Sequence, residues 1–188
     1  VDAGRIDDSR QLIDEYDSGD SRVSRIYEND SGPSDGLKKG FSVAKGTILC
    51  YINADDYLIP GALSFVRKCF LEDKDCDVLL GAIKIADEQG RISWRGRIPD
   101  IPTKTRLKAG VLQYYQQGTF FRRECYLQSG GFNENNRTCW DRELVINMAL
   151  LGARFLRTTC PLGVFRLHRD SITGAGNNAV EYKKDLQR

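Results

Sequence analysis

The chain has 188 residues, a length that suits one domain with a sizeable hydrophobic core and leaves little room for two. Hydrophobic residues make up 40% and charged residues 29%, and no apolar run approaches the roughly 20 residues of a membrane-spanning helix. The formal net charge of +2 gives no electrostatic reason to expect a nucleic-acid partner. These properties predict a globular domain without a transmembrane segment.

The six cysteines are scattered and form no CxxC pair. Several lie inside apolar segments, so we expect reduced core thiols, as in cytoplasmic proteins, rather than zinc ligands. The opening residues, VDAGRIDDSR, have neither the basic start nor the apolar stretch of a signal peptide. We therefore predict a cytoplasmic protein.

The first half of the chain alternates between helical and strand-like patterns. Helices are expected over 9–17, from a polar turn at 31–35 onward, and over 60–72, with strands over 23–28 and 47–53. This βαβα order indicates parallel strands connected by crossover helices that cover the sheet.

The second half has a different rhythm. Two strands within 77–96 flank a hairpin turn signal at 88–90, and a basic, proline-containing loop over 97–110 follows. The remaining predicted elements are a strand near 118–123, a short helix over 124–128, a helix over 141–151, and strands near 153–158 and 162–168.

An apolar run over 48–52 leads directly into Asn53, Ala54, Asp55 and Asp56. Such a run is typical of a buried parallel strand, here ending in carboxylates at the sheet edge where open α/β sheets bind ligands. Two adjacent carboxylates repel each other, and a divalent cation that also attracts a polyphosphate would relieve the repulsion. The alternative is that Asp55 and Asp56 only form a turn before the next helix.

Five segments in order resemble the motifs of family 2 glycosyltransferases with the GT-A fold. They are VDAGRIDDS, GPSDGLKKGFSVAKGTILCYINADD, QQGTFFRRECYLQSGGFNE, CWDRELVINMALLGARF and FRLHRDSIT. Together they cover nearly the whole chain, and their order is more specific than any one of them. The chain departs from the family pattern at Ala3, Arg5 and Ile6 in the first turn, at Lys38, where Asn is usual, and at Asn53, which replaces an Asp of the DxD triplet.

The resemblance implies the GT-A nucleotide-diphospho-sugar transferase fold, an α/β architecture. Its sheet is expected to be mostly parallel and Rossmann-like, flanked by helices, with a small antiparallel part in the second half. We expect a single domain over 1–188, with a nucleotide-binding half over 1–75 and an acceptor-binding half over 76–188. The family's first strand has no counterpart, which predicts an N-terminally truncated domain whose open sheet edge pairs with another copy in a homo-oligomer.

The resemblance also implies the reaction, an inverting transfer of a sugar from a nucleotide diphosphate sugar, expected to be a UDP-sugar. The acceptor would be a hydroxyl of a glycan or lipid-linked molecule in polysaccharide or glycoconjugate synthesis. Mn²⁺ or Mg²⁺, held by Asp55, Asp56 and His168, would neutralise the leaving diphosphate. Two alternatives stay open. His168 could be a partly exposed histidine at a strand end that hydrogen-bonds the backbone and binds no metal. The whole chain could be a catalytically inactive remnant that binds nucleotide sugars.

Asp141 directly follows Trp140 at the start of the predicted helix 141–151 and matches the family's catalytic base. The N–H groups of a helix start can hold a carboxylate there, but their field lowers its pKa, so desolvation would have to offset them. The alternative is a plain N-cap aspartate. Trp140, Gln117 and Glu143 are the candidates for acceptor contacts, although Trp140 also suits the core.

The candidates for nucleotide contacts are Asp2, Asp35, Lys39, Asn53 and Ala54. Asp2 follows a strand-like residue and could accept a hydrogen bond from base or ribose, whereas Asn53 offers only a neutral carbonyl oxygen. Asp35 also fits a helix cap, and Lys39 also fits a solvated surface.

Six basic residues lie between positions 91 and 108, against the single acid Asp100. A solvated loop is the default interpretation of such a charge run. Contact with an acidic glycan, a phosphorylated lipid or the inner face of a membrane is the secondary interpretation.

Overall fold

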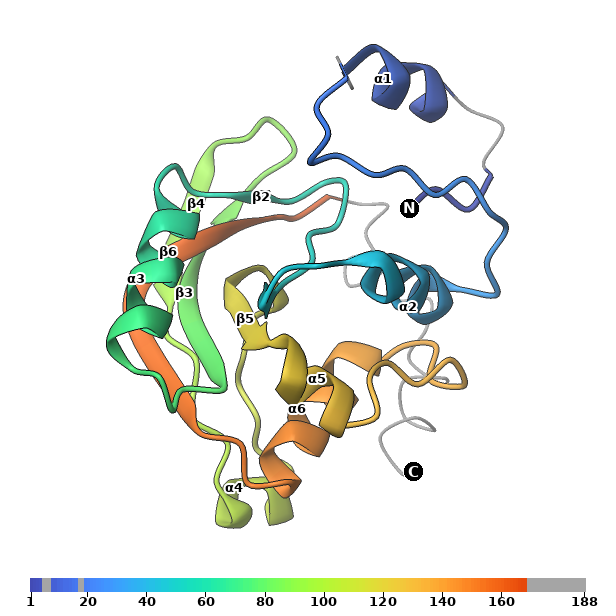
Figure 1. The fold of residues 1–188 in the computed structure, drawn as a ribbon. Helices are drawn as coiled ribbons and strands as arrows, with labels where there is room; N and C mark the ends of the chain where they lie inside the picture. The colour runs from blue at the N-terminus through green and yellow to red at the C-terminus, as the bar shows by residue number, and fades with distance from the viewer. Residues whose placement is uncertain (5–7, 17–18, 169–188) are drawn as a thin grey trace.

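The computed structural model describes residues 1–4, 8–16 and 19–168 (Figure 1). Within them a six-stranded sheet has the order β1-β5-β3-β6-β2, and β4 pairs with β3. The strands are β1 (Ile48–Leu49), β2 (Tyr57–Leu58), β3 (Val78–Ala86), β4 (Ile92–Arg97), β5 (Thr119–Arg122) and β6 (Phe155–Arg166). The helices are α1 (Ser9–Tyr16), α2 (Pro33–Val43), α3 (Ala62–Glu72), α4 (Lys104–Lys108), the 3₁₀ turn η1 (Gln116–Gly118), α5 (Arg123–Gln128) and α6 (Trp140–Leu150). None of the helices in this described part has the length and apolar character needed to cross a membrane.

The sheet is mixed, and its centre is the parallel pair β3 and β6. The pairs β1–β5, β5–β3, β3–β4 and β6–β2 are antiparallel. The predicted α/β class is confirmed, but parallel pairing is less extensive than predicted. The reason is the position of β5, which lies between β1 and β3, so that two strands of the same direction are not neighbours.

Three predicted segments differ in detail. The predicted strand over 23–28 contributes a single parallel bridge, between Tyr27 and Asp2. The predicted loop over 97–110 contains α4, whose start is capped because the Thr103 side chain accepts from the backbone N–H of Arg106. The two predicted strands at the end of the chain are one strand, β6, because Pro161 interrupts its pairing with β3 only as a local register shift.

Alternate strand residues divide the core into two layers, as the two-residue period of a strand requires. In β3, Val78 and Leu80 face the layer of α2, α5 and α6, whereas Leu79 faces α3. In the β1 region, Leu49 and Tyr51 face the first of these layers. Figure 1 shows α3 on one side of the sheet and α2, α5 and α6 on the other.

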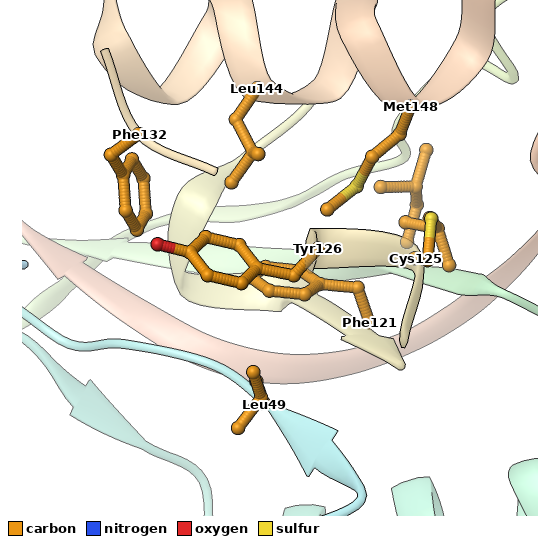
Figure 2. Packing of buried hydrophobic residues seen from close by; sticks show 9 residues of the cluster. Leu49, Phe121, Cys125, Tyr126, Phe132, Leu144 and Met148 are labelled. Atoms are coloured by element: carbon orange, nitrogen blue, oxygen red, sulfur yellow. The ribbon is translucent and has the colours of Figure 1, made fainter. Parts of the chain in front are cut away.

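Helix α6 is anchored by one face to the larger of these layers. Leu144 and Met148, one helical turn apart, point toward the rings of Tyr126 and Phe121, beyond which Leu49 lies (Figure 2). The two rings are stacked at an interplanar angle of 18°. This packing fixes the orientation of α6 and therefore of the residues in its first turn.

The turn η1 lies directly against the sheet because two glycines, Gly118 and Gly163, leave room for it. A Cβ atom at Gly118 would be 2.4 Å from the carbonyl oxygen of Gly81, and one at Gly163 would be 2.3 Å from that of Gln117. Any larger residue would push η1 away from β3 and β6. The close approach places η1, with its two glutamines Gln116 and Gln117, against β3 at Gly81 and against β6 at Gly163.

We predict that Met148→Ala lowers the free energy of unfolding by about 2–5 kcal/mol, because a fully buried side chain is removed and a cavity remains. Leu150→Ala on the same helix is the matched control. Its side chain is 64% exposed, so its effect should stay within about 0.5 kcal/mol. Urea denaturation measures both, and equal losses would contradict the packing of α6 through this face.

Candidate functional site

Two of the three predicted metal ligands lie side by side. The turn after β1 and the segment after β6 meet so that Asp55 Oδ2 is 2.8 Å from His168 Nε2. Both side chains are partly exposed, 32% for Asp55 and 27% for His168. A carboxylate oxygen and an imidazole nitrogen therefore contact each other at a partly exposed place, from segments 113 residues apart.

The third, Asp56, is directed elsewhere and is 7% exposed. Its Oδ2 accepts hydrogen bonds from Gln117 Nε2 at 2.7 Å and from Asn53 Nδ2 at 3.3 Å. Its Oδ1 accepts from the backbone N–H of Arg166 at 3.0 Å. Burial raises the pKa of Asp56, and the hydrogen bonds from Gln117 and Arg166 oppose that shift.

The Asp55–His168 pair suits a metal ion that shares its ligands with phosphate. Among the residues described, no group of three or more His, Cys, Asp or Glu side chains is placed to hold an ion. Ions such as Mg²⁺ at phosphate sites commonly take one or two protein ligands and complete their shell with substrate oxygens and water. Asp55 and His168 could thus supply part of the coordination shell of a metal ion that is also bound by a diphosphate. The described residues do not supply a complete shell by themselves.

Asp141 lies in the first turn of α6 but does not cap it. The residue preceding the helix is Cys139, whose N–H donates to Asn136 Oδ1 at 2.8 Å. The side chain of Asp141 instead accepts hydrogen bonds from the hydroxyl of Tyr114 and, at 2.8 Å, from the backbone N–H of Arg142. The N-cap alternative is therefore wrong for this aspartate.

Desolvation controls the charge of Asp141. Burial raises its pKa, and the hydrogen bond from Tyr114 and the nearby Arg142 only partly oppose the shift. Burial, together with the nearby Asp141 charge, also raises the pKa of the Tyr51 and Tyr114 hydroxyls well above the usual value. The desolvation that a base in this position requires is thus present.

Tyr51 connects the surroundings of Asp141 to the Asp55–His168 pair. Its side chain faces the α6 layer, where Trp140 also packs, and its carbonyl oxygen accepts a hydrogen bond from Gln116 Nε2. Asp55 lies four positions after Tyr51, so their Cα atoms lie within about 14 Å of each other. One short segment therefore contributes to both parts of the site.

The N-terminal nucleotide candidate is tied to its own loop. Asp2 Oδ1 accepts from the N–H of Gly4 at 2.8 Å, and Oδ2 lies 3.6 Å from Arg10 Nε. The Asp2 side chain is 8% exposed. In this structure its carboxylate stabilises the turn that follows it.

The candidates around the start of α2 contact one another. Asp35 accepts hydrogen bonds from the backbone N–H and the hydroxyl of Ser31, and the backbone bond is the main cause of its lowered pKa. Lys39 forms ion pairs with Asp35 at 3.8 Å and Glu28 at 3.7 Å. Gly32 is the residue preceding α2, so Asp35 is not its N-cap, and the Asp35 carboxylate instead bonds Ser31 in the turn before the helix.

The other candidates fall into two groups. Asn53 and Ala54 are exposed at the turn beside Asp55, whereas Gln117 is buried against Asp56. Glu143 accepts hydrogen bonds from the side-chain amides of Asn133 and Asn136 and so braces the loop before α6. The structure thus brings Asn53 and Gln117 to the Asp55 turn and directs Glu143 away from it.

Four residues of this region were not predicted from the sequence: Tyr51, Tyr114, Gln116 and Arg166. Strand alternation over 48–51 could have placed Tyr51 on the side of α6, since Leu49 is on the same side. Tyr114 lies in an irregular segment, and no local pattern indicates its contact with Asp141. Arg166 contributes its backbone N–H, which no side-chain motif can reveal.

Comparisons with known proteins agree with this geometry. A sequence model of the family described as Glycosyl transferase family 2 matches residues 1–130. The chain is 23% identical to the hyaluronan synthase of Pasteurella multocida and 23% identical to the chondroitin synthase of Pasteurella multocida (strain Pm70), each over 191 aligned residues and 98% of this chain. It spans only about a fifth of the length of these relatives, 19% and 20% respectively.

Solved structures of S. aureus TarS 1–349 share the fold. The TM-score is 0.70 against its complex with UDP-GlcNAc and 0.68 against its complex with UDP, both at 17% sequence identity. These matches cover 90% and 89% of this chain, and 49% and 50% of the TarS chain. The predicted GT-A fold is confirmed by this likeness.

We predict that Asp141→Asn raises the melting temperature at pH 7. Because the pKa of Asp141 is raised in the folded state, its contribution to stability falls as the pH rises from the unfolded pKa, about 3.9, through the folded value. The uncharged variant avoids this loss, so its advantage should shrink toward pH 4 in calorimetry.

Asp35→Asn is the control of opposite sign. The pKa of Asp35 is lowered, so the variant should melt below the wild type at pH 7, and the difference should fade as the pH falls through the lowered pKa. Asp141→Asn melting below the wild type at pH 7 would contradict the desolvation of Asp141.

Proposed function

Because the chain belongs to glycosyl transferase family 2, we propose that it transfers a sugar from a nucleotide diphosphate sugar to an acceptor hydroxyl. The observation that supports this most directly is the meeting of Asp55 and His168 beside a short segment that also reaches Asp141. A site for diphosphate and a desolvated carboxylate are thus joined by residues 51–55. Both are needed to displace a diphosphate by a hydroxyl.

Asp55 and His168 would hold Mn²⁺ or Mg²⁺, which when bound supplies positive charge against the diphosphate of the donor. Asn53 and Ala54, exposed in the same turn, are placed for contacts with the nucleotide. Their side chains and backbone carry no charge, so they would orient the donor without competing for the cation.

Asp141 would act as the general base. The acceptor oxygen forms a bond to the anomeric carbon while the bond from that carbon to the diphosphate oxygen breaks, and the hydroxyl proton passes to Asp141. A raised pKa brings a carboxylate closer to the operating pH and makes it a stronger base. Displacement from the side opposite the leaving group would make the reaction inverting.

The donor and acceptor classes rest on the comparisons. TarS was solved with UDP-GlcNAc and with UDP, which favours a UDP-sugar as the donor here. The relatives that match nearly the whole chain are a hyaluronan synthase and a chondroitin synthase, which favours a glycan acceptor in polysaccharide or glycoconjugate synthesis. A cytoplasmic location would give the protein access to nucleotide sugars.

We predict that Asp55→Ala and His168→Ala each weaken Mn²⁺-dependent UDP binding by at least about tenfold, because each removes one of two protein ligands. Titration calorimetry with and without Mn²⁺ measures the effect. Asp75→Ala is the control, since its side chain is 84% exposed in an ion pair with Arg154. Metal-independent UDP binding by the wild type would refute the metal site.

We predict that Asp141→Asn lowers kcat for UDP-sugar hydrolysis by about 10²–10⁴-fold, as expected when a general base is removed. Mn²⁺-dependent UDP binding should stay unchanged, because Asp141 is bonded by Tyr114 and Arg142, whereas the predicted ligand Asp55 contacts His168. In the wild type the rate should rise with pH as Asp141 loses its proton. A variant that retains wild-type kcat would exclude Asp141 as the base.

A further inference from the structure

Asp56 is a buried carboxylate beside the Asp55–His168 pair, yet both its oxygens are occupied by protein donors. Gln117 and Asn53 donate to Oδ2, and the backbone of Arg166 donates to Oδ1. The side chain is 7% exposed, whereas that of Asp55 is 32% exposed. The two adjacent acidic residues therefore have different surroundings, and Asp55 presents its Oδ2 to His168.

These hydrogen bonds join three segments that are distant in the sequence. Asp56 is one residue after Asp55, and Arg166 is two residues before His168. The bond between Asp56 Oδ1 and the Arg166 N–H thus ties together the two segments that carry the predicted metal ligands. Gln117 fastens the same carboxylate to η1, which lies against the sheet at Gly163.

We propose that Asp56 is a positioning residue that sets the separation of Asp55 and His168 and does not itself bind the metal. This inference rests on the proposed function, because it concerns the metal site of that function. Both oxygens of Asp56 are directed at protein donors, so turning the carboxylate toward an ion would break its buried bonds to Gln117 or Arg166. Partners that orient metal ligands typically change metal affinity by 10–100-fold when they are removed.

The substitutions Asp56→Asn and Asp56→Ala separate positioning from ligation. Asparagine retains an oxygen for the Arg166 N–H, and its amide can donate to Gln117 and Asn53 once the amides of both residues rotate by half a turn. We expect Asp56→Asn to keep the Mn²⁺ dissociation constant within about threefold of the wild type. Asp56→Ala, which removes every bond, should raise it about 10–100-fold. Titration of Mn²⁺ in the presence of UDP, followed by electron paramagnetic resonance, measures both.

The matched control is Asp55→Asn, one residue away. It makes the same chemical change at the predicted ligand, so it should lose at least tenfold in Mn²⁺ affinity. An equal loss in Asp56→Asn and Asp55→Asn would show that Asp56 is a ligand and would overturn this inference alone. Absence of Mn²⁺ binding by the wild type would instead refute the proposed function.

A second variant and a metal-free measurement guard against misfolding of Asp56→Ala. Gln117→Leu keeps the volume of the side chain but removes its bond to Asp56. His168 is the sole histidine, so its ring gives one set of nuclear magnetic resonance signals in the untagged protein. Without metal, Gln117→Leu should shift these signals and Asp56→Asn should not. Unshifted signals in Gln117→Leu would show that Asp56 and Gln117 do not position His168.

Discussion

The Asp55–His168 part of the candidate site depends on the hydrogen bonds around one buried carboxylate, that of Asp56. The turn after β1 and the segment after β6 meet there, and η1 lies beside them. β1 and β2 have only two residues each, so regular sheet pairing contributes little to holding the turn between them. Hydrogen bonds to a charged group are stronger than neutral ones, and in a buried setting they stay unscreened by water.

Asp56 and Asp141 are two desolvated carboxylates with different proposed roles, one structural and one catalytic. Burial raises the pKa of both, but their donors differ: Asp56 accepts from the side chains of Gln117 and Asn53 and the backbone of Arg166, whereas Asp141 accepts from the Tyr114 hydroxyl and from backbone N–H groups of its own helix. The bonds to Asp56 join segments that are distant in the sequence, so this carboxylate acts as a structural tie. The Asp141 carboxylate is desolvated, so it is less stable as an anion and takes up a proton more readily. The expected stabilisation by Asp141→Asn follows from this second condition.

The sequence predicted the elements that local patterns encode and missed the contacts that the topology creates. Helical periodicity gave α3 and α6 nearly to the residue, and the turn signal at 88–90 gave the β3–β4 hairpin. The insertion of β5 between β1 and β3 has no local signature, and neither does the contact of Tyr114 with Asp141. The adjacency of Asp55 and Asp56 in the chain suggested that both hold a metal. Their opposite environments depend on Gln117 and Arg166, which are 61 and 110 residues from Asp56.

The N-terminal candidates differ from this buried network in how easily a ligand could displace their present contacts. Lys39 and Asp35 are partly exposed, with side-chain exposures of 26% and 19%, and their ion pair is 3.8 Å long. Pairs of this kind contribute at most about 1 kcal/mol, so a nucleotide that offered a better partner could replace them at little cost. The bonds of Asp56 are buried, and breaking one would strand a desolvated donor at a higher cost. Binding is therefore expected to rearrange the start of α2 while the Asp55 turn keeps its geometry.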